Sequence, residues 1–477
     1  MINIQKIDEK QKMDLKITGV TCDSREVKDG FIFVAINGEV DRGENYIPEA
    51  IKKGAKAIVA SSSFRGQFDD KIALIKDNNP RKRLSEISAL IYPKYPEIIC
   101  AVTGTNGKTS TTNFLHQLWQ LLNKNSSSIG TLGVINNEEI KDINNTTPDP
   151  VALHRTLSDL HNSGVSHLVL EASSHGLAQH RMDGVKVRAA GFTNISQDHL
   201  DYHKNMEDYF IAKKRLFTEI LPKENYAVIC VDTESGRELS SIVKKSGRGV
   251  IEIGESANSF NLRRVTPSEN GMDIIFQYSG RQFSIPLKVE GYFQAMNILC
   301  AVGLAIASGE PSERVFDNMQ HLKPISGRLE YCGKNIKGAK IYVDYAHTPA
   351  ALTAAIFSLR ELTENNIIVV FGCGGERDKL KRSVMGGIAS EYADFVIVTD
   401  DNPRNEDPEE IRSQIINNCN DALEISDRAE AIKKGIETGK KGDSIIISGK
   451  GHEKYQVIGQ DTVPFSDQET VRNILGK

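Results

Sequence analysis

The sequence predicts a protein of the α/β class, with three domains built around mostly parallel sheets. The chain has 477 residues, which corresponds to about three domains of roughly 150 residues each. Short apolar runs typical of strands alternate with helical patterns along most of the chain, as in parallel sheets with helices on both faces. A glycine-rich turn at residues 103–109 separates one such run from a helical pattern. We place the domains at residues 1–96, 97–324 and 325–477.

Composition indicates a soluble globular protein, since 39% of the residues are apolar and 26% are charged. The net charge of -4 gives no indication of a nucleic-acid partner, although a local basic pocket for an anionic substrate is compatible with it. The seven cysteines are scattered, odd in number and without a CxxC pair, which disfavours a disulfide framework or zinc site and fits a reducing compartment. The polar N-terminus does not resemble a signal peptide, and no apolar run approaches the roughly 18 residues of a membrane span. We expect a cytoplasmic monomer.

The front and central segments differ in their patterns. The front segment has short apolar runs at residues 31–36 and 57–60, and residues 91–96 carry two prolines, as in a linker. In the central segment we expect strands at residues 98–102, 167–171, 189–193 and 227–231. Between about 250 and 287 we expect shorter strands in a small antiparallel addition, and a helix at 294–308 closes the segment.

The third segment has the clearest alternation of strands and helices. We expect strands at residues 340–344, 366–371, 395–399 and 444–448, each followed by a charged or glycine-rich loop. Ligands of open α/β sheets bind beyond the carboxyl ends of the strands. These loops are therefore where binding residues are expected.

The turn that follows the strand at 98–102 reads Thr-Gly-Thr-Asn-Gly-Lys-Thr. Gly104 and Gly107 let backbone N–H groups face a polyphosphate, and the helix that follows offers its positive end. Lys108 can reach the β and γ phosphates, and the Thr109 hydroxyl can bind Mg²⁺. Val102 stands where the standard phosphate loop has its first glycine, so this loop is a shorter variant. A purely structural turn is disfavoured, because strand, loop, Lys-Thr and helix occur in the required order.

This loop resembles the ATP loop of the Mur ligase family, which also includes folylpolyglutamate synthases. The resemblance implies an ATP-dependent ligase that activates a carboxylate as an acyl phosphate, which an amine then displaces. Such chemistry needs Mg²⁺ and a site that excludes water. The resemblance extends through all three segments and implies a UDP-binding α/β domain, a central P-loop ATPase-like domain and a Rossmann-like C-terminal domain. The front segment disfavours the folylpolyglutamate synthases, which lack it.

The resemblance also implies the catalytic and metal-binding residues. Glu171 ends an expected strand, where a carboxylate can hold Mg²⁺, and His199 matches the second-metal ligand of the family. Lys213 matches the lysine that this family carries as N6-carboxylysine, an anionic oxygen ligand; unaided, it would be interpreted as a solvated helix lysine. The implied metal ligands are Thr109, Glu171, His199 and Lys213. The implied catalytic residues are Lys108, His199 and Lys213.

ATP contacts are implied in the central and third segments together. They are Thr103, Gly104, Thr105, Asn106, Gly107, Lys108, Thr109, Asn297, Arg328 and Asp344. Gln294 stands where the family usually has asparagine and is not assigned. Because Arg328 and Asp344 are remote in sequence from the phosphate loop, we expect the third domain to close over ATP and exclude water.

The front and central segments contain motifs similar to those that bind UDP-muramoyl-dipeptide in the family. The implied contacts are Ser24, Asn145, Thr146, Thr147, Ser173, Gln179 and Arg181. Ser24 matches a uridine or diphosphate contact. Arg181 has a physical rationale as well, since a guanidinium binds a substrate carboxylate through two parallel hydrogen bonds.

The Asp-Asn-Pro-Arg motif at residues 401–404 resembles the signature of family members that add meso-diaminopimelate. Lysine-adding relatives usually have another residue in place of this arginine. Diaminopimelate carries a second, distal carboxylate with which Arg404 can pair, whereas lysine has none. Glu453 is expected to take the ammonium of the amino-acid head. The implied contacts are Arg377, Asp401, Asn402, Pro403, Arg404, Gly449 and Glu453.

Together these motifs imply addition of meso-2,6-diaminopimelate to UDP-N-acetylmuramoyl-L-alanyl-D-glutamate in peptidoglycan precursor synthesis. Three alternatives stay open: the same ligation with L-lysine, a nucleotide-binding regulator without ligation, and a phosphotransferase that releases a stable product. The last would leave the motifs at 401–404 and 449–453 unexplained.

Overall fold

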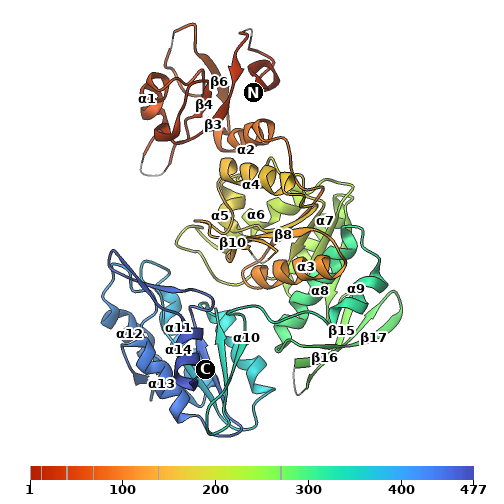
Figure 1. The fold of residues 1–477 in the computed structure, drawn as a ribbon, viewed down its shortest axis with the longest axis vertical. Helices are drawn as coiled ribbons and strands as arrows, with labels where there is room; N and C mark the ends of the chain where they lie inside the picture. The colour runs from red at the N-terminus through yellow and green to blue at the C-terminus, as the bar shows by residue number, and fades with distance from the viewer. Residues whose placement is uncertain are drawn as a thin grey trace.

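The computed structural model describes residues 2–476 except 12, 39, 40, 68, 138, 269, 270 and 420. Its chain forms three successive α/β bodies, each around its own sheet (Figure 1). The front body lies at one end of the molecule, the central body carries the largest sheet, and the third body packs beside the central one. The predicted fold class is therefore confirmed.

The front body is a four-stranded parallel sheet with helices on both faces. Its strands, in sheet order, are β3 (Gly19–Thr21), β4 (Phe31–Val34), β5 (Ala57–Ser61) and β6 (Ala73–Asp77). Alternate residues of a strand face opposite sides of the sheet. The apolar side chains on one face of the sheet therefore pack on α1 (Ile47–Lys52), and those on the other face pack on α2 (Pro80–Ile91). The hairpin of β1 (Ile2–Asn3) and β2 (Lys16–Ile17) joins the α2 side.

The central body contains an eleven-stranded mixed sheet. Its strands, in sheet order, are β10 (Glu139–Lys141), β9 (Gly133–Asn136), β8 (Ser126–Gly130), β11 (His167–Glu171), β7 (Ile98–Thr103), β12 (Ala189–Phe192), β13 (Tyr226–Cys230), β14 (Gly249–Gly254), β15 (Phe260–Ser268), β16 (Gly271–Tyr278) and β17 (Arg281–Leu287). The strands from β8 to β15 run parallel, and both ends of the sheet are antiparallel.

The sequence interpretation of residues 250–287 was partly wrong. The antiparallel addition is present as β15–β17, but β14 belongs to the parallel part. The added strands are not short either, since they have nine, eight and seven residues. Much of β15 is exposed and polar, so its apolar run is shorter than its hydrogen-bonded length.

Helices cover both faces of the central sheet. On one face lie α3 (Lys108–Leu121), α8 (Tyr292–Ala307) and α9 (Ser312–Met319). On the other lie α4 (Pro150–Asn162), α5 (Ser174–Ala178), α6 (Met206–Arg215) with the π-helical turn η4 (Leu216–Ile220), and α7 (Glu234–Lys245). Among the described residues, no helix is long and apolar enough to cross a membrane.

The third body is a doubly wound sheet. Its strands, in sheet order, are β18 (Glu330–Lys334), β19 (Lys340–Asp344), β23 (Ser444–Ser448), β20 (Ile367–Phe371), β21 (Phe395–Val398) and β22 (Leu423–Glu424). Its helices are α10 (Pro349–Arg360), α11 (Leu380–Tyr392) and α12 (Pro408–Ile416) on one face, and α13 (Arg428–Thr438) and α14 (Asp467–Leu475) on the other. The hairpin of β24 (Tyr455–Ile458) and β25 (Asp461–Pro464) follows β23. Because β19, β20, β21 and β23 are parallel, the loops after them meet at one edge of the sheet.

Candidate active site between the central and third domains

The phosphate loop joins the end of β7 to the start of α3, and two of its glycines are required by geometry. Gly104 has φ +155° and Gly107 has φ +84°, both in the region that favours glycine. A Cβ on Gly104 would lie 1.9 Å from Thr193 Oγ1, and one on Gly107 would lie 2.2 Å from Asn297 Oδ1. The loop therefore fits closely against the residues after β12 and against α8.

Residues after β12 hold the loop in place. The backbone N–H of Thr105 donates to Asn194 O (2.9 Å), and that of Asn106 donates to Asn194 Oδ1 (3.0 Å). Thr193 Oγ1 donates to Asn106 O at 2.6 Å. Neither Thr193 nor Asn194 was expected from the sequence, because their partners lie almost ninety positions away.

Two lysine side chains meet at the same carbonyl of the loop. Lys108 Nζ donates to Gly104 O (2.9 Å) and Thr105 O (2.8 Å), and Lys213 Nζ donates to Gly104 O at 2.8 Å. Lys213 is 1% exposed, and its Nζ lies 4.3 Å from the centre of the Tyr209 ring. Burial lowers the pKa of Lys108 and lowers that of Lys213 well below its ordinary value. Lys213 is therefore not a solvated helix lysine.

Two predicted metal ligands lie near these lysines. Glu171, at the end of β11, is buried and accepts hydrogen bonds from Thr131 N (2.9 Å) and Thr131 Oγ1 (3.2 Å). His199 has φ +54°, and its Nε2 lies 3.4 Å from Asp198 Oδ2. Burial lowers the pKa of His199 to about 4, which leaves its imidazole neutral and able to coordinate. The charges of Glu171 and Asp198 both act on the pKa of Lys108.

A donor set for Mg²⁺ is present, though in separate side chains. The Thr109 hydroxyl and the Glu171 carboxylate are oxygen donors of the kind this ion prefers. Within the described part of the chain, no group of three His, Cys, Asp or Glu residues could hold a metal by itself. The predicted ligands thus fit an ion that also binds substrate phosphates, as is usual for Mg²⁺.

The third domain reaches the phosphate loop through Arg328. Arg328 Nη2 donates to Thr109 Oγ1 at 3.0 Å, and its guanidinium lies 4.4 Å from the centre of the Tyr345 ring. Gln294 Nε2 donates to Arg328 O (3.1 Å), and Asn297 Nδ2 donates to Gln294 Oε1 (3.0 Å). Gln294, to which the sequence motifs assign no role, therefore joins α8 to the start of the third domain.

Asp344, at the end of β19, stabilises the start of the third domain next to Arg328. Its Oδ2 accepts from Leu329 N (2.6 Å) and its Oδ1 accepts from Ala346 N (2.7 Å). The side chain is buried, and burial raises the pKa of Asp344 to about 6 although Arg328 and the backbone donors act against this shift.

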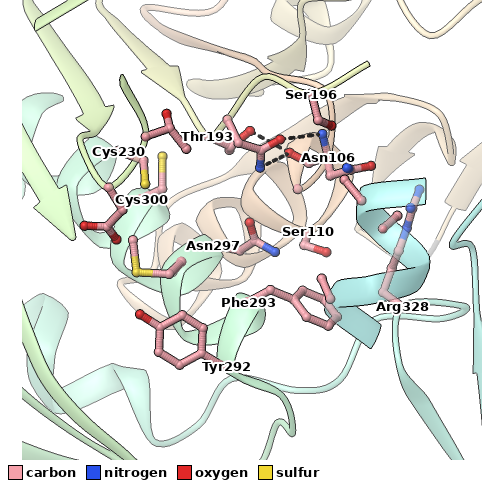
Figure 2. Close-up of a pocket in the computed structure, with 18 of the residues that line it drawn as sticks. Asn106, Ser110, Thr193, Ser196, Cys230, Tyr292, Phe293, Asn297, Cys300 and Arg328 are labelled. Atoms are coloured by element: carbon pink, nitrogen blue, oxygen red, sulfur yellow. Dashed lines mark hydrogen bonds between the residues drawn. The ribbon is translucent and has the colours of Figure 1, made fainter. Parts of the chain in front are cut away.

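A cavity of about 380 Å³ lies between the central and third domains beside the phosphate loop. Figure 2 shows Asn106, Thr193 and Ser196 on one side of it and Tyr292 and Phe293 on the other. The cavity thus has a polar end at the phosphate loop and an apolar end able to take a flat base. Of the predicted ATP contacts, those that line it are Asn106, Gly107, Asn297, Arg328 and Asp344. Apolar lining residues not expected from the sequence include Tyr292, Phe293, Met296, Cys230 and Cys300.

The predicted dipeptide contacts form a connected cluster next to Glu171. Thr147 Oγ1 donates to Glu171 O at 2.7 Å and accepts from Ser173 N at 2.9 Å. Arg181 Nη1 donates to Thr147 O (2.6 Å), and its Nη2 donates to Gln179 Oε1 (2.8 Å). Thr146 Oγ1 lies 3.2 Å from Thr131 Oγ1, and Asn145 is exposed beside it.

A second cavity, of about 510 Å³, lies between the front and central domains. Gln179 lines it, together with front-domain residues that include Cys22, Asp41 and Tyr46. Ser24 is not among its lining residues, since the hydroxyl is buried and donates to Glu49 Oε2 at 2.8 Å.

The loops of the third domain bring the predicted amino-acid contacts together. Asn402 Nδ2 donates to Glu453 Oε2 at 2.9 Å. Lys450, a fully buried residue that was not expected from the sequence, donates to Asn402 Oδ1 (3.1 Å) and Glu453 Oε2 (2.9 Å). Gly449 has φ +117°, and a Cβ there would lie 2.5 Å from Asp401 Oδ2.

The two predicted carboxylate-binding arginines lie on neighbouring loops. Arg404 Nη1 donates to two backbone carbonyls, Gly375 O (2.7 Å) and Asn402 O (3.4 Å). Pro403 precedes it and packs its carbonyl against Gly375. Arg377 is exposed on the adjacent loop.

A phosphate loop beside a cavity, next to a second α/β domain with its own cluster of charged side chains, is typical of a nucleotide-dependent enzyme. The sequence agrees with three models of the Mur ligase family: the family catalytic domain (residues 16–97), the middle domain (102–305) and the glutamate ligase domain (327–451). The chain belongs to the Mur ligase family, whose members are ATP-dependent ligases. The family predicted from the sequence is thus confirmed.

Similar proteins extend over the whole chain. A UDP-N-acetylmuramoyl-L-alanyl-D-glutamate--2,6-diaminopimelate ligase of Rhizobium meliloti is 43% identical over 462 residues, which cover 97% of this chain and 95% of the relative. A solved structure of a ligase of the same name has a TM-score of 0.72 and 30% identity, covering 100% of this chain and 99% of that one. A Mycobacterium tuberculosis folylpolyglutamate synthase shares the fold, with a TM-score of 0.65 at 18% identity over 83% of this chain.

Proposed function

We propose that the protein joins meso-2,6-diaminopimelate to UDP-N-acetylmuramoyl-L-alanyl-D-glutamate, using ATP, in peptidoglycan precursor synthesis and thus in maintaining cell shape and division. The observation that carries the proposal is the near-complete, 43% identical match to relatives of that activity. The loops of Arg377 and Arg404, with Asn402 and Glu453 beside them, supply charges suited to a diamino dicarboxylic acid.

The reaction proceeds in two chemical steps. An oxygen of the D-glutamyl γ-carboxylate attacks the γ-phosphorus of ATP, and ADP leaves as the acyl phosphate forms. The amine of diaminopimelate then attacks the acyl carbon, the C–O bond to phosphate breaks, and the amine loses a proton. Lys108 donates hydrogen bonds to the transferring phosphoryl group, and positioning with electrostatic stabilisation supplies most of the rate.

Mg²⁺ is the proposed metal, as two ions: Thr109 and Glu171 would hold the first, and His199 and Lys213 in its carbamylated form would hold the second. When bound, the ions would neutralise the phosphates of ATP. The depressed pKa of Lys213 supports the modification, because only the neutral amine reacts with carbon dioxide. Lys108, His199 and Lys213 are the proposed catalytic residues.

The proposed domain boundaries are 1–96, 97–324 and 325–477, and the dipeptide and ATP each bind where two of these domains meet. The proposed contacts of the UDP-dipeptide are Ser24, Asn145, Thr146, Thr147, Ser173, Gln179 and Arg181. Of these, Gln179 lines the cavity between the front and central domains, which supports its placement. ATP binds at the phosphate loop and the cavity beside it. We propose a cytoplasmic monomer.

The test is ATP-dependent phosphate release with the UDP-dipeptide and either meso-diaminopimelate or L-lysine. We expect release that depends on both the dipeptide and diaminopimelate, with a much higher kcat/KM than for lysine. Faster turnover with lysine would contradict the role of Arg404. ATP binding without any amino-acid-dependent turnover would identify a regulator instead.

A further inference from the structure

The two loops that carry Arg377 and Arg404 are joined by residues outside the proposed site. The loop after β20 spans residues 372–379 and the loop after β21 spans residues 399–407. Arg382, in the first turn of α11, and Glu406, at the end of the second loop, lie between them. Neither was singled out from the sequence.

Arg382 is buried completely and binds Glu406 with both ends of its guanidinium. Nη1 donates to Glu406 Oε2 at 3.0 Å and Nη2 donates to Glu406 Oε1 at 3.1 Å. Nη2 also donates to Gly374 O (3.2 Å), and Nη1 donates to Gln414 Oε1 (2.9 Å). A bidentate pair of this kind fixes direction as well as distance.

The Glu406 carboxylate is bound by two further donors of the first loop. It accepts from Glu376 N at 2.5 Å, and Lys379 Nζ lies 3.2 Å from its Oε2. Hydrogen bonding, chiefly from Arg382, lowers the pKa of Glu406 to about 2, so it is ionised at neutral pH. The Glu406 side chain, on the second loop, is therefore bound by Arg382 of α11 and by two groups of the first loop, Glu376 N and Lys379 Nζ.

The backbones of the two loops also contact each other next to Arg404. Gly375 N donates to Asn402 O at 2.9 Å, and a Cβ on Gly375 would lie 1.9 Å from Pro403 O. Arg404 Nη1 in turn donates to Gly375 O at 2.7 Å. The direction of the Arg404 guanidinium thus depends on the spacing of the two loops, which the Arg382–Glu406 pair maintains.

We propose that Arg382 and Glu406 are positioning residues that hold Arg404 in place for the distal carboxylate of the incoming amino acid. This inference rests on the proposed function. It assigns part of the selection of a dicarboxylic substrate to a buried ion pair that does not touch that substrate. Without the pair, Arg404 keeps its charge but loses its fixed direction.

The test compares Glu406→Gln with the unaltered protein. Glutamine keeps the shape of the side chain but removes its charge and one acceptor. We expect the KM for meso-diaminopimelate to rise roughly tenfold, while the KM values for ATP and the UDP-dipeptide change less than about twofold. Asp394→Asn is the matched control, because Asp394 pairs with Arg360 on the surface of the same domain (39% and 40% exposed side chains).

A double substitution separates positioning from a general structural effect. If Glu406 acts through Arg404, Glu406→Gln adds little to the loss already caused by Arg404→Ala. Full additivity of the two losses would overturn the inference, as would an unchanged KM for diaminopimelate in the single variant. If Glu406→Gln fails to fold, Lys379→Gln takes its place, because it removes an exposed donor to the same carboxylate. This variant is expected to raise the KM for diaminopimelate by about twofold. An unchanged KM for diaminopimelate would count against the inference.

The unaltered protein distinguishes this inference from the proposed function. If it releases no phosphate in response to diaminopimelate, the proposed function fails and the inference fails with it. If it turns over normally and Glu406→Gln keeps the KM for diaminopimelate, the inference alone is overturned.

Discussion

At the scale of single residues, Gly107 lies at a close contact between the phosphate loop and α8. Its φ is +84°, and a side chain there would place its Cβ 2.2 Å from Asn297 Oδ1, so only glycine fits. Lys108 and Lys213 both donate to the carbonyl of Gly104. Small shifts of this backbone therefore move the Nζ atoms of both lysines.

Gly107→Ala is expected to raise the KM for ATP by tenfold or more, because the methyl group must displace Asn297 or the loop. Gly247→Ala is the control, since Gly247 has a similar φ of +83° with nothing within 4 Å of the added atom. That substitution is expected to cost about 1 kcal/mol of stability and leave kinetics intact. Steady-state kinetics and thermal unfolding measure both; equal kinetic losses would contradict the explanation.

Asp344 gives a pH dependence whose sign follows from its buried carboxylate. Its pKa of about 6 in the folded protein lies above the ordinary 3.8, so folding favours the protonated form. This contribution to stability is complete below about pH 3.8 and is lost as the pH rises through about 6. Between pH 4 and 7, the unfolding free energy of Asp344→Asn is expected to gain about 2–3 kcal/mol relative to the unaltered protein. Urea unfolding across this range checks it, and parallel pH profiles would refute it.

The roles of site residues that form a motif of neighbouring positions could be predicted from the sequence. The roles of residues whose partners lie far away in the sequence could not. The phosphate loop was recognisable because its glycines, lysine and threonine are adjacent in the chain. Lys450 resembles any glycine-flanked lysine until folding brings Asn402, 48 positions away, to its ammonium. Gln294 is an ordinary helix glutamine until Arg328 O, 34 positions away, accepts its hydrogen bond.

At the scale of elements, α8 carries much of the nucleotide cavity. Its first turns place Tyr292, Phe293 and Met296 against the cavity, while Gln294 and Asn297 turn toward the third domain and the phosphate loop. The rest of the helix is buried against α3 and the sheet. The helix thus connects the apolar end of the cavity to its phosphate end.

Gln294→Leu leaves Arg328 O and Asn297 Nδ2 without their partner and is expected to cost about 1–3 kcal/mol of stability. The KM for ATP is expected to rise severalfold, because both residues border the cavity. Gln117→Leu is the control. Gln117, on α3, also forms hydrogen bonds with the backbone, since it donates to Lys323 O and accepts from Lys323 N. It does not line the cavity. A similar change in KM for both variants would indicate a general effect of lost hydrogen bonds.

Elements buried on both faces were predicted well, and half-exposed ones were not. The strands expected at 167–171, 340–344 and 444–448 form at those residues, because central parallel strands are continuous apolar runs. β15 extends to Ser268 through residues that are mostly exposed. Its length comes from hydrogen bonds to β16, which leave no apolar signal in the sequence.

At the scale of the molecule, the Arg328 guanidinium connects the third domain to the phosphate loop. Its hydrogen-bond partner, Thr109, lies 219 positions away in the sequence. The sequence motifs indicated that the third domain would approach ATP. They did not give the contact of Arg328 with Thr109 Oγ1, because domain placement depends on surfaces assembled from several segments. Binding of nucleotide in the cavity should therefore stabilise both domains together.

A nonhydrolysable ATP analogue at 100 times its Kd is expected to stabilise the protein by about 2.7 kcal/mol, which corresponds to a rise in melting temperature of several degrees. In Arg328→Ala the rise at the same analogue concentration is expected to be clearly smaller, because the bridge and a cavity-lining cation are lost. Arg360→Ala, a surface change in the same domain, controls for stability. Scanning calorimetry measures all three, and equal shifts would show that Arg328 takes no part in binding.

The sulfur atoms in the nucleotide cavity have a chemical consequence of their own. Cys230 and Cys300 both line this cavity (Figure 2). Burial raises the pKa of the Cys230 thiol to about 11 and raises that of Cys300 as well. Thiolates, not thiols, react with peroxides and alkylating agents. The two cysteines of the cavity therefore remain almost entirely thiols at neutral pH, so thiol-directed alkylating agents should modify them slowly.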